Sequence, residues 1–168
     1  MLNIRHASIA DGAGINRIGN HYINTTPVNF KTDPLSLEER ETWINSFSLS
    51  GPYQLFVAEE DDSILGYASS AQFHERAAYD TSVATAIYLD PSACKKGLGT
   101  QLYTHLFLAL AKEDLNRAFA GITIPNPASE ALHLKFGFKK VGTFTEAGRK
   151  YDQYWDVLWM EKTSKCKL

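Results

Sequence analysis

Residues 87–100 combine an apolar run, a proline break and a basic, glycine-rich turn, and they are the part of the chain best suited to chemistry. The turn reads K-K-G-L-G-T at residues 95–100 and leads into an amphipathic stretch. Glycines let consecutive backbone N–H groups converge, and a helix N-terminus adds about half a positive charge, so this turn can hold an anion such as a pyrophosphate. An ordinary strand-to-helix loop also uses glycine, and the pattern alone leaves both interpretations open.

A second group of candidate residues consists of Asn126, Ser129 and His133. Spacings of three and four residues place such side chains on one face of a helix. An imidazole changes charge near neutral pH, so His133 can serve as an acid or a base. It can equally be a packed core histidine, which is the ordinary interpretation of an isolated histidine.

The patterns of metal sites and of covalent nucleophiles are missing from the sequence. The His74-Glu75 pair has no second histidine at helical spacing, and there is no C-x-x-C pair, so the common zinc and redox motifs fail. No G-x-S-x-G elbow and no Walker A spacing are present. The G-L-G sequence is not followed by the third glycine of a dinucleotide fingerprint, because Leu102 stands there. We therefore expect no metal and no covalent enzyme intermediate.

Composition narrows the class of protein further. The chain has 168 residues, 44% of them hydrophobic, which suits one domain over residues 1–168. Seventeen Lys+Arg against nineteen Asp+Glu leave a net charge of -2, so we expect no nucleic-acid partner and no membrane association. Apolar runs reach only six residues, at 106–111, whereas a transmembrane helix needs roughly 20. Two cysteines and a start without a secretory pattern favour the cytoplasm.

Hydrophobic periodicity predicts the elements that must position these groups. Helical spacing predicts helices, and alternating or continuous apolar runs predict strands. We expect strands at 2–6, 53–59, 63–72, 82–89, 118–124, 138–144 and 151–160, and helices at 8–23, 36–47, 97–112 and 128–136. The order β-α-α-β-β-β-α-β-α-β-β predicts an α/β fold with a mixed sheet and helices on its faces.

The residues that could do chemistry also carry a family resemblance, and it extends over essentially the whole chain. The matching segments are H-Y-I at 21–23, V-N-F at 28–30, R-A-A-Y-D at 76–80, I-Y-L at 87–89, G-L-G at 97–99, L-Y-T-H-L at 102–106, N-x-x-S-x-x-x-H at 126–133 and W-D-V at 155–157. Together they resemble the GNAT acyltransferases, and within them the phosphinothricin acetyltransferase group. This resemblance implies transfer of an acetyl group from acetyl-CoA to the amine of phosphinothricin, methionine sulfoximine, methionine sulfone or a similar small acceptor.

The resemblance also implies which residues bind the cofactor. The backbone of Ile87, Tyr88 and Leu89 would hold the pantetheine arm as an added strand. Asn126 and Ser129 match positions near the pantetheine and the sulfur. The CoA phosphates would lie on the turn formed by Lys95, Lys96, Gly97, Leu98, Gly99 and Thr100. Cys94 stands where the family usually has Gln or Arg, so we expect weaker cofactor binding.

Two catalytic positions depart from the family pattern. His133 occupies the place of a tyrosine that protonates the departing thiolate, and an imidazole there can act as the acid. Ala84 occupies the place of a glutamate base, and an alanine cannot move a proton. Three consequences are possible. A water relay bounded by Thr85 removes the ammonium proton, another carboxylate such as Asp80 removes it, or turnover of the family substrate is poor.

Acceptor-binding residues follow from the same resemblance. Arg76 matches an arginine near the anionic end of the acceptor, for which a guanidinium offers a bidentate fork. Phe30 matches an aromatic wall of the acceptor pocket, and Tyr79 and Thr85 match further positions on the acceptor side. The family typically forms homodimers. A weakened acetyl-CoA-binding protein and a protein or peptide acetyltransferase are the rival interpretations.

Overall fold

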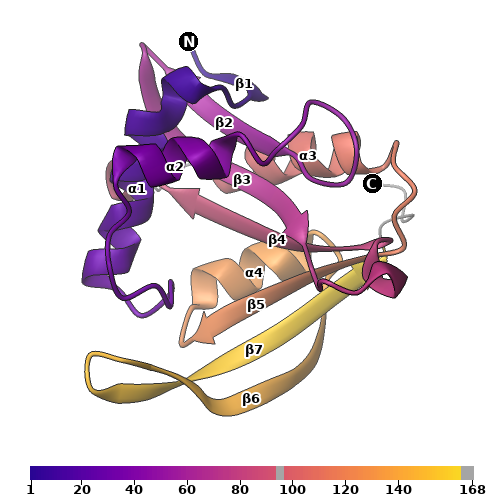
Figure 1. Ribbon diagram of the computed structural model, residues 1–168. Helices are drawn as coiled ribbons and strands as arrows, with labels where there is room; N and C mark the ends of the chain where they lie inside the picture. Colours follow the sequence, from indigo (N-terminus) through magenta and orange to yellow (C-terminus); the bar gives the residue numbers. More distant parts are fainter. Residues whose placement is uncertain (94–96, 164–168) are drawn as a thin grey trace.

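One mixed sheet carries helices on both of its faces (Figure 1). The computed structural model describes residues 1–93 and 97–163. Cys94, Lys95 and Lys96 therefore lie outside the described residues. The elements are β1 (Asn3–His6), α1 (Gly12–Thr25), α2 (Leu37–Ile44), β2 (Leu55–Glu60), β3 (Ser63–Gln72), β4 (Ser82–Leu89), α3 (Leu98–Leu110), β5 (Arg117–Ile124), α4 (Pro127–Lys135), β6 (Lys139–Lys150) and β7 (Gln153–Thr163).

The predicted order of strands and helices is confirmed, and its seven strands form a single sheet in the order β1-β2-β3-β4-β5-β7-β6. All neighbouring strands are antiparallel except β4 and β5, which are parallel. The central parallel pair needs a crossover, and α3 supplies it. The expected start of the second helix is also confirmed, because Ser36 caps α2 by accepting a hydrogen bond from the backbone N–H of Glu39. The first helix starts later than the predicted residue 8, since residues Ile9–Asp11 form a 3-10 turn and α1 begins at Gly12.

The core lies in two layers because the strands send alternate side chains to opposite faces. In β2, Phe56 and Ala58 pack under α3, whereas Leu55 and Val57 pack under α1 and α2. The larger layer joins α3 to β4, β5 and β7, with Leu102, Tyr103 and Leu106 fully buried. Each helix thus gains its stability from an apolar face laid on the sheet.

The parallel pair β4 and β5 opens partway along its length. Its strands pair from Ser82–Arg117 to Ala84–Phe119, and beyond that register they diverge, with α4 beside the opening (Figure 1). Beyond Ala84 of β4 and Phe119 of β5, residues of the two strands line a cavity instead of continuing the β4–β5 ladder, while β4 stays paired with β3 and β5 with β7. The freed backbone groups of the opened strands are available to an extended ligand.

The C-terminal hairpin differs from the expected strands. The sequence pattern predicts a last strand that begins at residue 151, but Tyr151 and Asp152 form the turn, with φ of 54° and 55°. The preceding strand β6 extends to Lys150, six residues beyond the expected end at 144. Polar residues on an exposed two-stranded ribbon give a weak periodic signal, because only one edge of β6 is paired and most of its side chains are exposed.

Candidate active site

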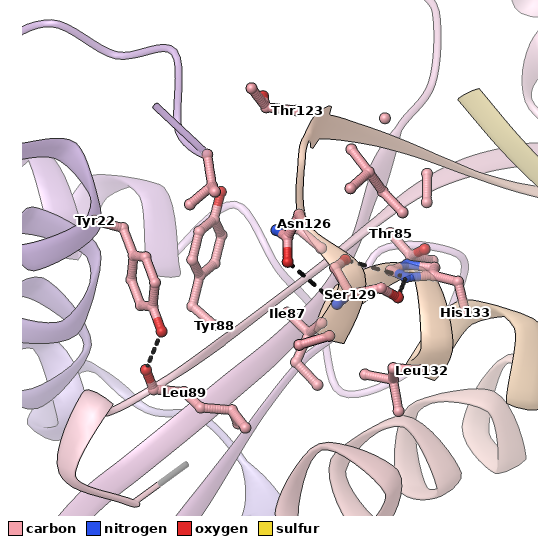
Figure 2. A pocket seen from close by; sticks show the side chains of 16 residues that line it. Tyr22, Thr85, Ile87, Tyr88, Leu89, Thr123, Asn126, Ser129, Leu132 and His133 are labelled. Atoms are coloured by element: carbon pink, nitrogen blue, oxygen red, sulfur yellow. Dashed lines mark hydrogen bonds between the residues drawn. The ribbon is translucent and has the colours of Figure 1, made fainter. Parts of the chain in front are cut away.

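A cavity of about 280 Å³ fills the opening between β4 and β5. Figure 2 shows its walls, which come from both strands and from the start of α4. The predicted cofactor residues Ile87, Tyr88 and Leu89 all line it. Tyr22 on α1 closes one end by donating its hydroxyl to the Leu89 carbonyl at 2.7 Å. This cavity, called the channel below, therefore has the backbone of β4 along its side.

The start of α4 brings the second predicted group to the same channel. Asn126 is the N-cap of α4, and its side-chain oxygen accepts the Ser129 backbone N–H at 3.2 Å. One turn further on, His133 faces the channel with Ser129 (Figure 2). The structure thus brings Asn126, Ser129 and His133 together with the opened strand β4.

Both ring nitrogens of His133 are engaged. Its Nδ1 lies 2.7 Å from the Ser129 backbone carbonyl, which can only accept, so Nδ1 carries the proton. Nε2 is then an acceptor, and the Tyr103 hydroxyl donates to it at 2.9 Å. The side chain is only 3% exposed, and this burial lowers the pKa of His133, although the bond to Ser129 opposes the effect. His133 is accordingly a neutral imidazole at neutral pH.

Tyr103 links His133 to Thr85 on β4. Burial raises the pKa of the Tyr103 phenol, so the hydroxyl keeps its proton. The Thr85 side chain hydrogen-bonds with the Tyr103 hydroxyl and lies 3.3 Å from the Phe119 carbonyl. Thr85, Tyr103 and His133 therefore form a hydrogen-bonded chain that begins at a channel wall.

A second cavity, of about 460 Å³, adjoins the channel. The two cavities share Val28, Thr85, Tyr88, Gly121 and Thr123. The rest of its lining comes from the 28–30 loop, the β6–β7 hairpin and one residue of β4: Asn29, Phe30, Phe144, Ala147, Val157, Trp159 and Ala84. A molecule in this cavity meets a molecule in the channel at Thr85 and Tyr88.

The walls of the second cavity are mostly apolar and aromatic. Ala84 lies in its lining, and no carboxylate lines either cavity among the residues that the structure describes. Tyr88 is positioned by a hydrogen bond from the Asn29 side chain at 3.3 Å, and burial raises the pKa of its phenol. At neutral pH these walls therefore offer hydroxyls, amides and aromatic faces instead of a charged base.

Phe30 forms one wall through an unusually close packing against Gly148 of β6. A Cβ at Gly148 would lie 2.2 Å from Phe30 Cε2, well inside contact distance. Phe30 is 38% exposed. Its ring reaches from the 28–30 loop to Gly148 on the hairpin. Glycine at residue 148 thus sets how near the aromatic wall comes to the hairpin.

Replacing Gly148 with alanine is expected to displace the Phe30 ring and to raise the KM for the acceptor about tenfold or more. The KM for acetyl-CoA should stay within about twofold, since neither Phe30 nor Gly148 lines the channel. Steady-state kinetics with each substrate varied in turn measures both values. Equal changes in the two KM values would contradict the assignment of Phe30 to the acceptor side.

Two predicted acceptor residues lie elsewhere in the single chain. Arg76 and Tyr79 are exposed on the loop between β3 and β4, and neither lines the two cavities. Tyr79 stacks near His74 and Phe73, with ring centroids 4.7 and 5.8 Å apart. Asp80, the alternative base, is exposed on the same loop. Phe30 and Thr85 are thus the predicted acceptor residues that the structure places in the cavity walls.

The described part of the predicted phosphate turn has the expected local geometry. Gly97 has a φ of 85°, a left-handed conformation that favours glycine, and directly precedes α3. A Cβ at Gly99 would lie 3.3 Å from Leu132 of α4, so a small residue lets α3 and α4 approach. Leu98 is buried beside it, and Thr100 Oγ1 accepts a hydrogen bond from Lys135 at 3.2 Å. None of these four residues lines the channel itself.

Asp90 fixes the chain where β4 leads toward this turn. Arg17 of α1 forms an ion pair with one of its carboxylate oxygens, while the backbone and side chain of Ser92 donate to the other at 2.8 and 2.6 Å. Burial opposes ionisation, but these bonds together hold the pKa of Asp90 below its usual value. The exit of β4 is thereby tied to α1.

Tyr103, Thr123 and Asn29 are site residues that sequence analysis did not assign. Tyr103 carried a usable signal, since it lies on the apolar face of the predicted helix 97–112 and a buried hydroxyl needs a partner. Asn29 lies in the V-N-F segment of the family resemblance but has no role assigned there, and Thr123 carried no signal. Their place in the walls depends on the opening of β4 from β5 and on the packing of the 28–30 loop.

No group of three or more metal-ligating side chains occurs within residues 1–93 and 97–163. Over the same ranges, no helix combines the length and the hydropathy needed to span a bilayer. The site therefore consists of backbone, hydroxyl, amide, imidazole and aromatic groups around two joined cavities. A parallel pair opened for an extended ligand, beside an acceptor cavity, is the arrangement of an acyltransferase that uses a CoA thioester.

Comparisons with known proteins agree with this class. Residues 4–159 match the family model for the acetyltransferase (GNAT) domain. A phosphinothricin N-acetyltransferase of Streptomyces coelicolor is 51% identical over 145 residues, 85% of each chain. An L-methionine sulfoximine/L-methionine sulfone acetyltransferase of Pseudomonas paraeruginosa is 28% identical over 95% of this chain and 92% of its own.

A solved structure agrees as well. The phosphinothricin acetyltransferase of Sinorhizobium meliloti in complex with acetyl-CoA superposes with a TM-score of 0.90 at 27% identity, over 96% of this chain and 88% of that one. The chain belongs to the GNAT acetyltransferase family. It is an N-acetyltransferase that takes its acetyl group from acetyl-CoA.

Proposed function

We propose that the chain acetylates the amine of a small amino-acid-like acceptor of the phosphinothricin, methionine sulfoximine or methionine sulfone type. The observation that carries this proposal is the second cavity, which is lined by Phe30 and the hairpin and meets the channel at Thr85 and Tyr88. Its volume of about 460 Å³ suits a small molecule. The curated relatives are named for phosphinothricin and for methionine sulfoximine and sulfone, which are small molecules with an amino group.

The cofactor side of the proposal assigns a role to each predicted residue. Ile87, Tyr88 and Leu89 hold the pantetheine arm along the opened edge of β4, and Asn126 and Ser129 lie near the sulfur. Gly97, Leu98, Gly99 and Thr100 shape the phosphate turn at the start of α3, to which Lys95 and Lys96 belong by sequence. The backbone along the channel and the φ of 85° at Gly97 support this assignment.

The chemistry is direct transfer. The acceptor ammonium first loses one proton to water, and the neutral amine then attacks the thioester carbonyl and expels the CoA thiolate. One proton must still pass from the new amide nitrogen to the sulfur. We assign this transfer to the chain of Thr85, Tyr103 and His133, in which neutral His133 takes the proton and then acts as the acid toward the thiolate. The hydrogen bond from Tyr103 to His133 supports this direction.

Arg76 and Tyr79 keep their predicted role in recognising an acidic acceptor. This role would be met in a homodimer, which the family typically forms. The hairpin has exposed apolar side chains that suit a subunit contact, namely Val141, Phe144 and Tyr154. We propose a homodimer that acts in the cytoplasm, where acetyl-CoA is available, with residues 1–168 as one domain. Light scattering after size exclusion gives the mass of the assembly directly.

The test is release of free CoA thiol from acetyl-CoA with a panel of acceptors. The panel holds phosphinothricin, methionine sulfoximine, methionine sulfone, methionine and a short peptide with a free N-terminus. We expect at least one of the first three to be acetylated and the peptide to be inert. Turnover of the peptide alone would favour a protein acetyltransferase instead.

Ala84 gives one rival function a specific basis, namely a weakened protein that binds acetyl-CoA without turnover. Running the panel on Ala84→Glu in parallel separates the two functions. Thiol release by the unmodified chain supports an enzyme that works without the glutamate. No release by the chain, together with release by Ala84→Glu, would mean an intact scaffold that lacks its base.

A further inference from the structure

Lys150, at the end of β6, is a buried cation that the proposed reaction does not use. Its side chain is 5% exposed, and burial lowers the pKa of its ammonium. No carboxylate of a described residue forms an ion pair with it. A charged side chain this deep in a hairpin needs compensation, because removing an ammonium from water is costly.

Two backbone carbonyls provide that compensation. Lys150 Nζ donates to the Ile23 carbonyl and to the Asn29 carbonyl, each at 2.6 Å. Ile23 lies in the last turn of α1, where carbonyls lack helical partners and a positive charge is favoured. Asn29 lies in the 28–30 loop that forms a wall of the acceptor cavity. One ammonium therefore joins the end of α1 to this loop.

The residues around Lys150 also contact other walls of the acceptor cavity. The Asn29 side chain donates to the Tyr88 hydroxyl at 3.3 Å, and the neighbouring Phe30 ring packs on Gly148, two residues before Lys150. Tyr151 follows Lys150 and donates its hydroxyl to the Ile23 carbonyl at 3.2 Å. The position of Lys150 thus fixes the loop, the hairpin and the aromatic ring of Tyr88 relative to one another.

We infer that Lys150 is the positioning residue of the acceptor cavity, and that its two hydrogen bonds to backbone carbonyls set the affinity and the selectivity for the acceptor. This inference rests on the proposed function, because it needs an acceptor to bind in that cavity. Lys150 and the two residues whose carbonyls it bonds, Ile23 and Asn29, are not among the residues that line the channel. Its removal should therefore raise the KM for the acceptor much more than the KM for acetyl-CoA.

The test replaces Lys150 with methionine, which keeps an unbranched side chain that is shorter by only the terminal nitrogen and removes both hydrogen bonds. We expect the KM for the acceptor to rise about tenfold or more, as for the loss of hydrogen bonds to a charged group. The KM for acetyl-CoA should change by less than about twofold. Discrimination between the preferred acceptor and methionine should also decrease in Lys150→Met.

Lys162 on β7 offers a matched control. It is also buried, at 6% exposed, but its ammonium lies over the Phe107 ring, 4.2 Å from the centroid, within the α3 core. Lys162→Met should lower the thermal midpoint without moving the acceptor KM. Equal acceptor KM values in the unmodified chain and in folded Lys150→Met would overturn the inference, and so would an equal rise in Lys162→Met.

Lys150→Gln covers the case in which Lys150→Met does not fold. Its amide can donate to one of the two carbonyls, so we expect a smaller rise in acceptor KM than for methionine, again without an effect on acetyl-CoA. An unchanged acceptor KM in folded Lys150→Gln would overturn the inference. Failure of the proposed function has a different signature, since no amine in the panel would then be acetylated by the unmodified chain.

Discussion

His133→Ala is expected to lower kcat by about a hundredfold or more, which is the contribution of a positioned acid or base. The imidazole is the last member of the hydrogen-bonded chain that begins at Thr85. Without it, the proton from the new amide nitrogen has no internal acceptor and must reach the thiolate through water. Pre-steady-state release of CoA thiol measures the change in the chemical step.

Two further variants separate catalysis from packing. Removing His133 leaves the buried Tyr103 hydroxyl without its acceptor, which costs about 1–3 kcal/mol of stability, so each thermal midpoint must be measured as well. Tyr103→Phe breaks the same chain with less loss of volume, and we expect a comparable fall in kcat. His105→Ala removes an exposed histidine of α3 and serves as the control. A destabilised Tyr103→Phe with normal kcat would contradict the proton chain and leave His133 a packing role.

Ala84→Glu is expected to raise kcat/KM about tenfold to a hundredfold at neutral pH for acceptors with a high amine pKa. A glutamate at residue 84 lies in the lining of the acceptor cavity, where it can take the first proton from the ammonium. In the proposed mechanism, the unmodified chain leaves this step to water. The gain should shrink for acceptors whose amine is already largely neutral.

The pH dependence of kcat/KM shows whether the glutamate of Ala84→Glu acts as a base. Below the pKa of the amine, the unmodified chain should gain about tenfold in kcat/KM per pH unit, because only the neutral amine reacts. Burial lowers the pKa of His133, so it stays neutral near pH 7 and adds no limb there. Ala84→Glu should flatten the profile above the pKa of the new carboxyl. Identical slopes in both proteins would contradict a missing base as the cause.

The fold was predictable because its strongest signals are local. Each of these signals can be recognised from the residues of one helix or strand alone. They are the apolar face of α3, the caps at Ser8 and Ser36, and the apolar run at Ser82–Leu89. The end of β6 could not be predicted, because the strand is mostly exposed and polar before Lys150 and the tight turn at Tyr151 and Asp152 lacks glycine and asparagine. Turns of that geometry usually show those residues.

The site was predictable on the cofactor side and less so on the acceptor side. Asn126, Ser129 and His133 fall on one helix, so their spacing alone keeps them together. Phe30, Gly148 and Lys150 come from distant parts of the chain and meet only through the packing of the hairpin on α1. A lysine among polar residues carries no sequence signal of burial. The assignment of Arg76 to the acceptor came from resemblance, and the single chain leaves it on an exposed loop.

Direct transfer between two adjoining cavities is the central claim, and mass spectrometry of one reaction mixture tests it. The protein is incubated with acetyl-CoA labelled in the acetyl group and with the acceptor that the panel selects. We predict labelled N-acetyl acceptor and free CoA in equal amounts, with the intact mass of the protein unchanged throughout. An acetylated protein that passes its label to the acceptor, or consumption of acetyl-CoA without an acetylated amine, would contradict it.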